Sequence, residues 1–145
     1  MAWARTAPRP LVFTNGVFEL LHVGHVALLE RAAGFGRSLL VAVNSDASAR
    51  TLDKAHGEPV ISQDDRARIV AAVGCVDRVV LFDDPTPLTL IEEVGPDVLV
   101  KGGDYASSAV VGGDAVARRG GRVEIVPLSA GRSTTQMLER IRASS

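Results

Sequence analysis

Runs of consecutive apolar residues alternate along this chain with longer segments in which apolar and polar residues are mixed. The apolar runs are rich in Val, Leu and Ile and predict strands at residues 10–14, 38–43, 78–82, 97–100 and 122–126. The mixed segments predict helices at residues 23–34, 46–52, 62–73, 87–94 and 133–143, with a looser helical stretch over 105–120. Strands without polar alternation are typical of a parallel sheet covered on both faces. The pattern therefore predicts an α/β fold, a Rossmann-like doubly wound parallel five-stranded sheet with helices on both faces.

The segment 62–73 has the clearest helical signals. Ser62 is the predicted N-cap, because its hydroxyl can accept a hydrogen bond from the first turn. Ile69, Val70 and Val73 recur at helical spacing and are the predicted buried side. Residues 1–9 precede the first strand and are expected to form a flexible N-terminal arm, so that the single domain covers 10–145.

Composition and charge narrow the classes of function. The chain has 145 residues, about one ordinary domain, and a formal net charge of −1, so no nucleic acid or anionic membrane partner is expected. No apolar run approaches the roughly 20 residues of a membrane span, and the N-terminus lacks the apolar core of a secretory signal. Cys75 is the single cysteine and a predicted core residue. We expect a cytoplasmic protein that binds any anionic ligand at a local site.

Polar residues follow each predicted strand and converge on one edge of the predicted sheet. The segments are 15–16, 44–46, 83–84, 101–104 and 129–135. In doubly wound sheets, ligands bind beyond the carboxyl ends of the strands, at the point where the strand order reverses. The sequence therefore predicts a binding site built from these five loops.

His22 and His25 stand three residues apart at the start of the first predicted helix, and three interpretations compete. A zinc pair on a helix favours a spacing of four residues and a third ligand, so metal ligation by protein side chains is not expected. The histidines can instead cap the helix. They can also bind phosphate, because a helix start presents free N–H groups and Gly24 allows close approach. These residues alone do not decide between a helix cap and a phosphate site.

The stretch TNGVFELLHVGH resembles the N-terminal motif of the HxGH nucleotidyltransferases, the cytidylyltransferase-like superfamily. Two later stretches, VKGGDY and GRSTT, resemble further motifs of that superfamily. Together with VAVNSDAS and PDVLVKGGDY, the set resembles the branch that adenylates D-glycero-β-D-manno-heptose 1-phosphate. The resemblance spans residues 11 to 142.

The resemblance implies roles for individual residues. It implies catalytic contacts to the triphosphate from His22, His25, Lys54 and Lys101. It implies nucleotide binding by Thr14, Asn15, Gly16, Phe18, Gly24, Gly102, Gly103, Asp104, Arg132, Ser133, Thr134 and Thr135. It implies acceptor binding by Asn44, Asp46 and Arg66. Ser133 or Thr134 also suits the N-cap of the last helix, which is compatible with phosphate binding.

Two positions depart from the branch. Glu58 stands where the branch has a basic residue, and Glu19 stands where the superfamily commonly has an aspartate. A triphosphate usually brings Mg²⁺, which keeps several waters and needs few protein carboxylates, so Mg²⁺ is the expected cofactor.

The implied function is transfer of AMP from ATP to a sugar 1-phosphate, with release of pyrophosphate. The partners implied are ATP, a sugar phosphate and a second copy of the chain in a homodimer. Two alternatives are another small HxGH enzyme, such as a glycerol-3-phosphate cytidylyltransferase, and a catalytically silent nucleotide-binding module on the same fold.

Overall fold

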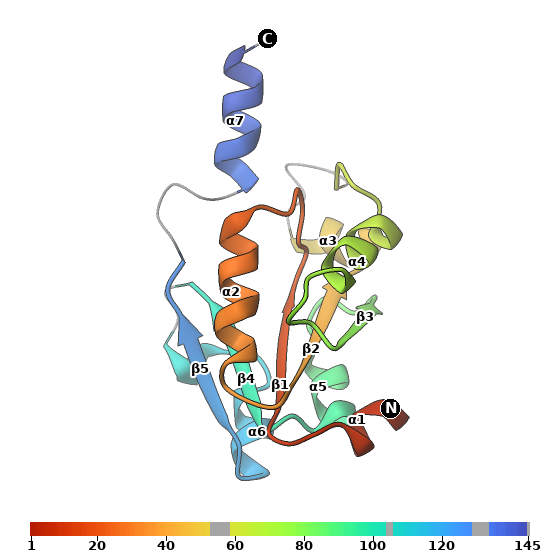
Figure 1. Cartoon of the computed structure of the whole chain (residues 1–145), viewed down its shortest axis with the longest axis vertical. Coiled ribbons are helices and arrows are strands. Elements are labelled where there is room, and N and C mark those ends of the chain that lie inside the picture. Colours follow the sequence, from red (N-terminus) through yellow and green to blue (C-terminus); the bar gives the residue numbers. More distant parts are fainter. Residues whose placement is uncertain (53–58, 104–105, 129–133, 145) are drawn as a thin grey trace.

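A computed structural model of the chain describes residues 1–52, 59–103, 106–128 and 134–144. The strands in these residues are β1 (Leu11–Gly16), β2 (Ser38–Asn44), β3 (Arg78–Phe82), β4 (Val98–Gly102) and β5 (Arg122–Val126). The helices are α1 (Ala2–Thr6), α2 (Val23–Ala33), α3 (Asp46–Leu52), α4 (Gln63–Ala71), α5 (Leu88–Val94), α6 (Gly113–Arg118) and α7 (Thr134–Ser144), with a short 3-10 helix η1 (Ser107–Ala109). Figure 1 shows the strands running upward and α7 standing above their ends.

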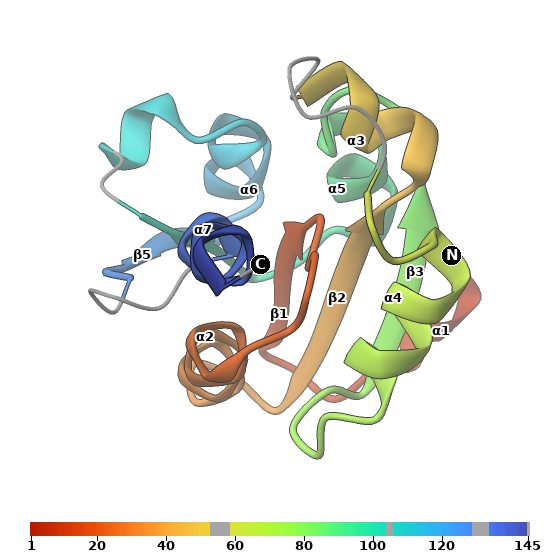
Figure 2. The same cartoon turned by 90° about the horizontal axis from the view of Figure 1, so that it is seen from above.

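The strands form one parallel sheet in the order β3-β2-β1-β4-β5. Seen from above in Figure 2, α2 and α4 lie on one face, and α3, α5 and α6 lie on the other. This arrangement confirms the predicted doubly wound α/β fold. The chain moves outward from β1 to β3 and then returns to place β4 beside β1. The strand order therefore reverses between β1 and β4, and a ligand site is expected beyond their carboxyl ends.

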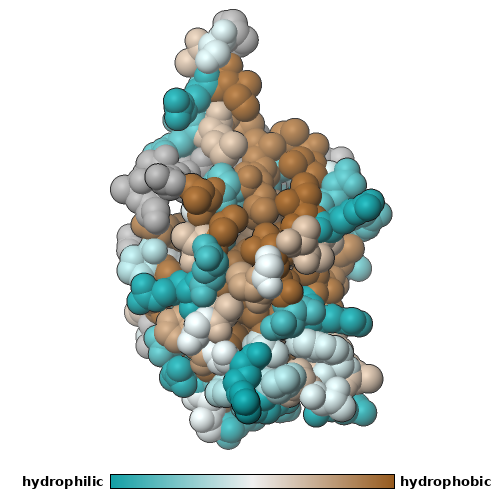
Figure 3. Space-filling model, in the orientation of Figure 1, coloured by the Kyte–Doolittle hydropathy of each residue, from teal (hydrophilic) through white to brown (hydrophobic). Residues whose placement is uncertain are grey.

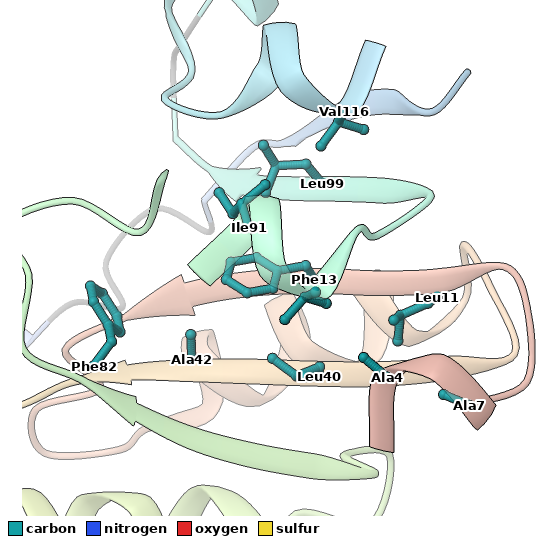
Figure 4. Packing of buried hydrophobic residues seen from close by; sticks show 11 residues of the cluster. Ala4, Ala7, Leu11, Phe13, Leu40, Ala42, Phe82, Ile91, Leu99 and Val116 are labelled. Carbon is teal, nitrogen blue, oxygen red and sulfur yellow. The ribbon is translucent and has the colours of Figure 1, made fainter. Parts of the chain in front are cut away.

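Alternate strand residues supply two separate cores. Leu11 and Phe13 of β1 belong to the core beneath α5 and α6, which Figure 4 shows together with Leu40, Ile91 and Leu99. Val12 belongs to the core on the opposite face, beneath α2 and α4, and packs there with strand residues such as Val41 and Val100. Each strand residue named here is at most 1% exposed. Burial on both faces explains why the strands read as unbroken apolar runs.

The N-terminal residues differ from the expected flexible arm. Residues 2–6 form α1, and Ala4 and Ala7 are buried in the core beneath α5. The guanidinium of Arg9 donates hydrogen bonds to the carbonyl oxygens of Ala4 and Gly95 and to Asp97. A five-residue helix has little stability of its own in water, so this packing is what holds it.

Three further expectations hold in part. Ser62 is the N-cap of α4, but its side chain makes no capping hydrogen bond. Ile69 is 40% exposed, whereas Val70 is buried. Cys75 is only half-buried at the margin of the core on the α2 and α4 face. Within the described residues, no helix is both long and apolar enough to cross a bilayer.

Candidate functional site

His22 and His25 form a reciprocal cap at the start of α2, directly beyond the carboxyl end of β1 (Figure 1). The N–H of Gly24 donates to Nδ1 of His22 at 3.0 Å, and the N–H of His22 donates to Nδ1 of His25 at 3.2 Å. The two ring centroids lie 4.0 Å apart. The capping interpretation of the sequence is therefore confirmed.

The cap also determines which nitrogen of each ring carries a proton. An Nδ1 atom that accepts a backbone N–H has no hydrogen, so the neutral imidazole carries its hydrogen on Nε2. Burial lowers the pKa of His22. Burial, and then the charge of His22, lower the pKa of His25 to about 4. At neutral pH both rings are neutral and each has an Nε2–H donor that the cap does not use.

Phe18 packs beside His25. Its ring is buried in the core on the α2 face and lies 5.5 Å from the ring of His25, measured between centroids. The expected contact between Phe18 and nucleotide is therefore corrected, because a side chain that is 5% exposed presents almost no surface to a ligand. A Cβ on Gly16 would lie 3.1 Å from the Phe18 ring, so glycine makes room for this packing.

The loop between β1 and α2 holds an uncommon backbone conformation. Phe18 and Leu20 have φ values of 55° and 43°, in the left-handed region that non-glycine residues rarely adopt. The surrounding contacts must hold such a conformation, and it is commonest at functional sites.

Glu19, between those two residues, tethers a distant segment to this loop. Its carboxylate accepts hydrogen bonds from the N–H groups of Val60 at 2.6 Å and Ile61 at 3.1 Å. The acidic side chain therefore connects the loop between β1 and α2, here called the histidine loop, to the segment that leads into α4. No motif near Glu19 indicates these distant partners.

Arg66 also corrects an expectation. It is 1% exposed, and its guanidinium donates hydrogen bonds to the carbonyl oxygens of Ile61, Val17 and Asn44 and to Oδ1 of Asp46, at 2.6 to 2.9 Å. A guanidinium that is enclosed in this way cannot contact the acceptor substrate in this structure. It joins the histidine loop, the end of β2, the start of α3 and the entry to α4. Asp46 takes part in that clamp through Oδ1.

The side chain of Thr14 is likewise unable to contact a nucleotide directly in this structure. Its side chain is buried, and its hydroxyl donates to the carbonyl oxygen of Val100 at 3.0 Å. This bond links β1 to β4 where the strand order reverses. The residue expected at the nucleotide therefore stabilises the edge that carries the site.

Asn15, Asn44 and Lys101 come from three strands and line one pocket of about 260 Å³. Thr86 and apolar residues from α3, from the turn before α5 and from the end of η1 onward line the rest of it. Burial lowers the pKa of Lys101. The structure thus brings together three residues that the sequence placed at the sheet edge.

Three of the predicted glycines, Gly24, Gly102 and Gly103, lie near the end of β5 instead of lining this pocket. Gly24 lines a smaller pocket of about 150 Å³ with Arg31 and Leu128, between α2 and the end of β5. A Cβ on Gly102 would lie 2.9 Å from Leu128, so this glycine permits close packing. Gly103 has φ 125° and donates its N–H to the carbonyl oxygen of Val126.

Several predicted residues lie outside the described part of the chain. These are Lys54, Asp104, Arg132 and Ser133. Thr134 begins α7, and Thr135 in its first turn is exposed. Among the described residues, no group of three His, Cys, Asp or Glu side chains is arranged to hold a metal ion.

The doubly wound parallel sheet, with a helix capped by two histidines at its switch point, together with the family match that follows, makes this chain a Rossmann-like nucleotidyltransferase. The profile of the cytidylyltransferase-like family matches residues 13–140, and the chain belongs to that family.

Similar proteins agree with this family. The chain is 55% identical over 138 residues to "Bifunctional protein HldE" of Koribacter versatilis, a match that covers 95% of this chain and 28% of that protein. The protein of the same name from Citrifermentans bemidjiense is 53% identical over 136 residues, with 94% and 28% covered. The chain thus spans little more than a quarter of the length of these curated relatives.

A solved structure shares the fold. The lipopolysaccharide core biosynthesis protein of Thermoplasma volcanium is 26% identical, with a TM-score of 0.67, and the match covers 82% of this chain and 95% of that one.

Proposed function

We propose that this chain transfers AMP from ATP to a sugar 1-phosphate, D-glycero-β-D-manno-heptose 1-phosphate, and releases pyrophosphate. A phosphate oxygen of the sugar phosphate attacks the α-phosphorus of ATP. The bond from that phosphorus to the oxygen bridging to the β-phosphate breaks, and the electron pair leaves with pyrophosphate. The acceptor brings its own nucleophile, so no serine or cysteine nucleophile is required.

The observation that carries this proposal is the pair of neutral histidines with unused Nε2–H groups at the start of α2. These donors, next to the partial positive charge of a helix start, suit the non-bridging oxygens of a phosphate in transfer. Such a reaction depends on positioning and on stabilising charge more than on covalent chemistry. Lys101 adds a cationic side chain from β4, across the switch point from β1.

Mg²⁺ is proposed to enter as part of the MgATP substrate. The described residues offer no carboxylate cluster to hold it, and Oδ1 of Asp46 is bonded to Arg66. No step of the proposed transfer is assigned to a protein-bound metal.

A homodimer and a cytoplasmic location remain predictions. Exposed apolar side chains support the homodimer, among them Val23 at 52% and Ile141 at 59%. Figure 3 shows hydrophobic residues gathered over the centre and upper part of one face. Light scattering of the purified chain at several concentrations tests the dimer, and a monomer at every concentration would contradict it.

Pyrophosphate release tests the proposed reaction. ATP, CTP, GTP and UTP are each paired with heptose 1-phosphate, glycerol 3-phosphate and phosphopantetheine. We expect turnover with ATP and heptose 1-phosphate. Preference for CTP with glycerol 3-phosphate would instead support the cytidylyltransferase alternative, and no release with any pair would support the silent module.

Two variants of one histidine separate chemistry from helix capping. His22→Ala removes both the cap and the Nε2–H donor, whereas His22→Ser restores a good N-cap and lacks the donor. We expect both variants to lower kcat by roughly 10²–10³-fold, as removal of one transition-state donor does. Near-normal kcat in His22→Ser would contradict the assigned role.

A further inference from the structure

A pocket of about 350 Å³ lies at the amino ends of β1, β4 and β5, at the opposite end of the sheet from the histidines. In Figure 1 this is the lower end of the strands. The residues that line it are Arg9, Pro10, Asp97, Gly120, Gly121 and Arg122. The substrates of a doubly wound sheet bind at the carboxyl ends of its strands, so the proposed transfer does not account for this pocket. Its volume lies within the ~300–1,000 Å³ range of pockets that hold small molecules.

Hydrogen bonds fix the walls of this amino-end pocket. Oδ2 of Asp97 accepts the N–H of Leu11 at 2.7 Å and an N–H of the Arg9 guanidinium at 3.1 Å. The carbonyl oxygen of Asp97 accepts the N–H of Arg122 at 3.0 Å. A Cβ on Gly121 would collide with that carbonyl oxygen, so glycine allows the turn after α6 to lie against the start of β4. The walls are therefore held in place before any ligand binds.

The guanidinium groups of Arg9 and Arg122 offer hydrogen-bond donors that the described part of the chain does not use. Nε of Arg122 donates to Oε1 of Glu124 at 2.9 Å, whereas its Nη1 and Nη2 donate to no described residue. Nη1 and Nη2 of Arg9 are bonded within the protein, and its Nε–H has no acceptor among the same residues. Two arginines thus border the pocket with N–H groups available to a ligand.

The charges around the pocket favour an anion. Arg118 and Arg119 directly precede the two glycines, so the turn from α6 to β5 has the sequence RRGGR. Ion pairs with nearby carboxylates balance the charges of Arg9 and Arg122. The guanidinium of Arg119 donates to a carbonyl oxygen instead of a carboxylate. The charges of Arg118 and Arg119 therefore remain in excess within this turn and the pocket lining.

The shape and the donors of the pocket suit a phosphate group. A guanidinium binds two oxygens of one phosphate through parallel N–H groups, and a phosphate has further oxygens for a second arginine. Gly120 has a φ of 85°, and a Cβ on it would have no neighbour within 4 Å beyond the adjacent residues. The open space beside this glycine leaves room for a tetrahedral group. A carboxylate offers fewer oxygens and a single charge, so it fits the two arginines less well.

We infer that the amino-end pocket binds the phosphate group of a small metabolite through Nη1 and Nη2 of Arg122 and Nε of Arg9. This site is separate from the transfer site, because none of its lining residues follows the carboxyl end of a strand. The inference goes beyond the proposed function and does not rest on it. A sugar phosphate and a nucleotide share the chemistry that the pocket recognises, and the probes below distinguish them.

Nuclear magnetic resonance titration of the full chain tests the inference at individual residues. The probes are inorganic phosphate, ribose 5-phosphate and adenosine 5′-monophosphate, with acetate as the carboxylate control. We expect the phosphate probes to cause saturable shifts at the backbone amides of Gly120, Gly121 and Arg122 and at Nε–H of Arg9. Tighter binding of ribose 5-phosphate than of the nucleotide would identify a sugar phosphate site, and the reverse would identify a nucleotide site.

Two variants of the same turn separate a pocket from a general basic surface. The side chain of Arg122 is 55% exposed, so Arg122→Gln should fold normally, and we expect it to bind phosphate roughly tenfold more weakly or worse, the scale of hydrogen bonds to a charged group. Arg118→Gln is the matched control, because it removes the same charge from a residue that does not line the pocket. It should change the affinity by less than about twofold, since salt screens a charge at the surface.

Four results would overturn the inference. The first is the absence of saturable shifts at these groups with every phosphate probe. The second is binding of acetate as tight as that of phosphate, and the third is equal weakening in Arg122→Gln and Arg118→Gln. The fourth concerns His22→Ser, which lacks a donor at the transfer site and should keep the shifts at Gly120 and Arg122. Their loss in that variant would mean that they report binding at the histidines.

Discussion

Replacing Arg66 with methionine should destabilise the protein strongly, although α4 itself would remain a good helix. The change removes a fully buried guanidinium and its four hydrogen bonds, and it leaves the carbonyl oxygens of Ile61, Val17 and Asn44 without that donor. The Asp46 side chain is 30% exposed and can be solvated, so the main cost is that of the carbonyl oxygens left without a donor, about 1–3 kcal/mol each, and we expect a total loss of about 3–5 kcal/mol. That loss is a large fraction of the 5–15 kcal/mol by which ordinary domains are stable.

Urea denaturation followed by circular dichroism measures this loss. With a slope of about 2 kcal/mol per molar urea, the midpoint should fall by roughly 2 M in Arg66→Met. Arg68→Met is the matched control, because Arg68 lies on the same helix but is exposed, and it should change stability by no more than about 0.5 kcal/mol. Equal midpoints for the two variants would refute the assignment of Arg66 as a buried clamp.

Arg66→Lys distinguishes the shape of the guanidinium from its charge. Lysine keeps the positive charge but lacks the planar fork that reaches several acceptors at once. We expect it to recover less than half of the stability lost in Arg66→Met. Full recovery would mean that charge pairing with Asp46, rather than the hydrogen bonds to carbonyl groups, holds the segments together.

Three other predictions concern the residues around this clamp. The pKa of His25 is 6.5 in the unfolded chain and about 4 in the folded protein, so the contribution of this neutral ring to stability is complete above pH 6.5 and is lost as the pH falls towards 4. The urea midpoint should therefore decline as the pH is lowered from 6.5 to 4, and it should decline less in His25→Ala. Thr14→Val should cost about 1 kcal/mol in a urea titration by removing the hydroxyl bond to Val100, while kcat/KM stays within a factor of about two; a tenfold loss would return Thr14 to the substrate site. Glu19→Gln keeps one acceptor oxygen but places an amide N–H₂ against one of the two backbone N–H groups that the carboxylate now binds, so kcat should fall more than the affinity for ATP. An unchanged kcat would show that this connection is dispensable.

Features set by local sequence were predicted closely. Helix α3 (Asp46–Leu52) and strands β3 (Arg78–Phe82) and β5 (Arg122–Val126) match the expected ranges at both ends. The polar residues after the strands share one edge because parallel strands end together. Asn15, Asn44 and Lys101 meet in one pocket for that reason.

Features set by contacts between distant segments could not be predicted in the same way. The four acceptors of Arg66 lie 5 to 49 positions away along the chain, so nothing near Arg66 in the sequence distinguishes it from Arg68. Phe18 follows a strand and looks like a pocket residue, but a left-handed backbone turns it into the core. Helix α1 is too short to be predicted from propensity, because the core beneath α5 holds it in place.

The reciprocal cap also makes the backbone of α2 a reporter for whatever the histidines bind. The amide hydrogens of His22 and Gly24 are each bonded to an imidazole ring, so they exchange with solvent only when the first turn frays and the ring moves away. An anion that accepts a hydrogen bond from Nε2–H restricts the motion of the ring and therefore slows that fraying. Deuterium uptake at these two amides would then fall as each candidate nucleotide is added, which allows ligands to be ranked before any acceptor has been identified.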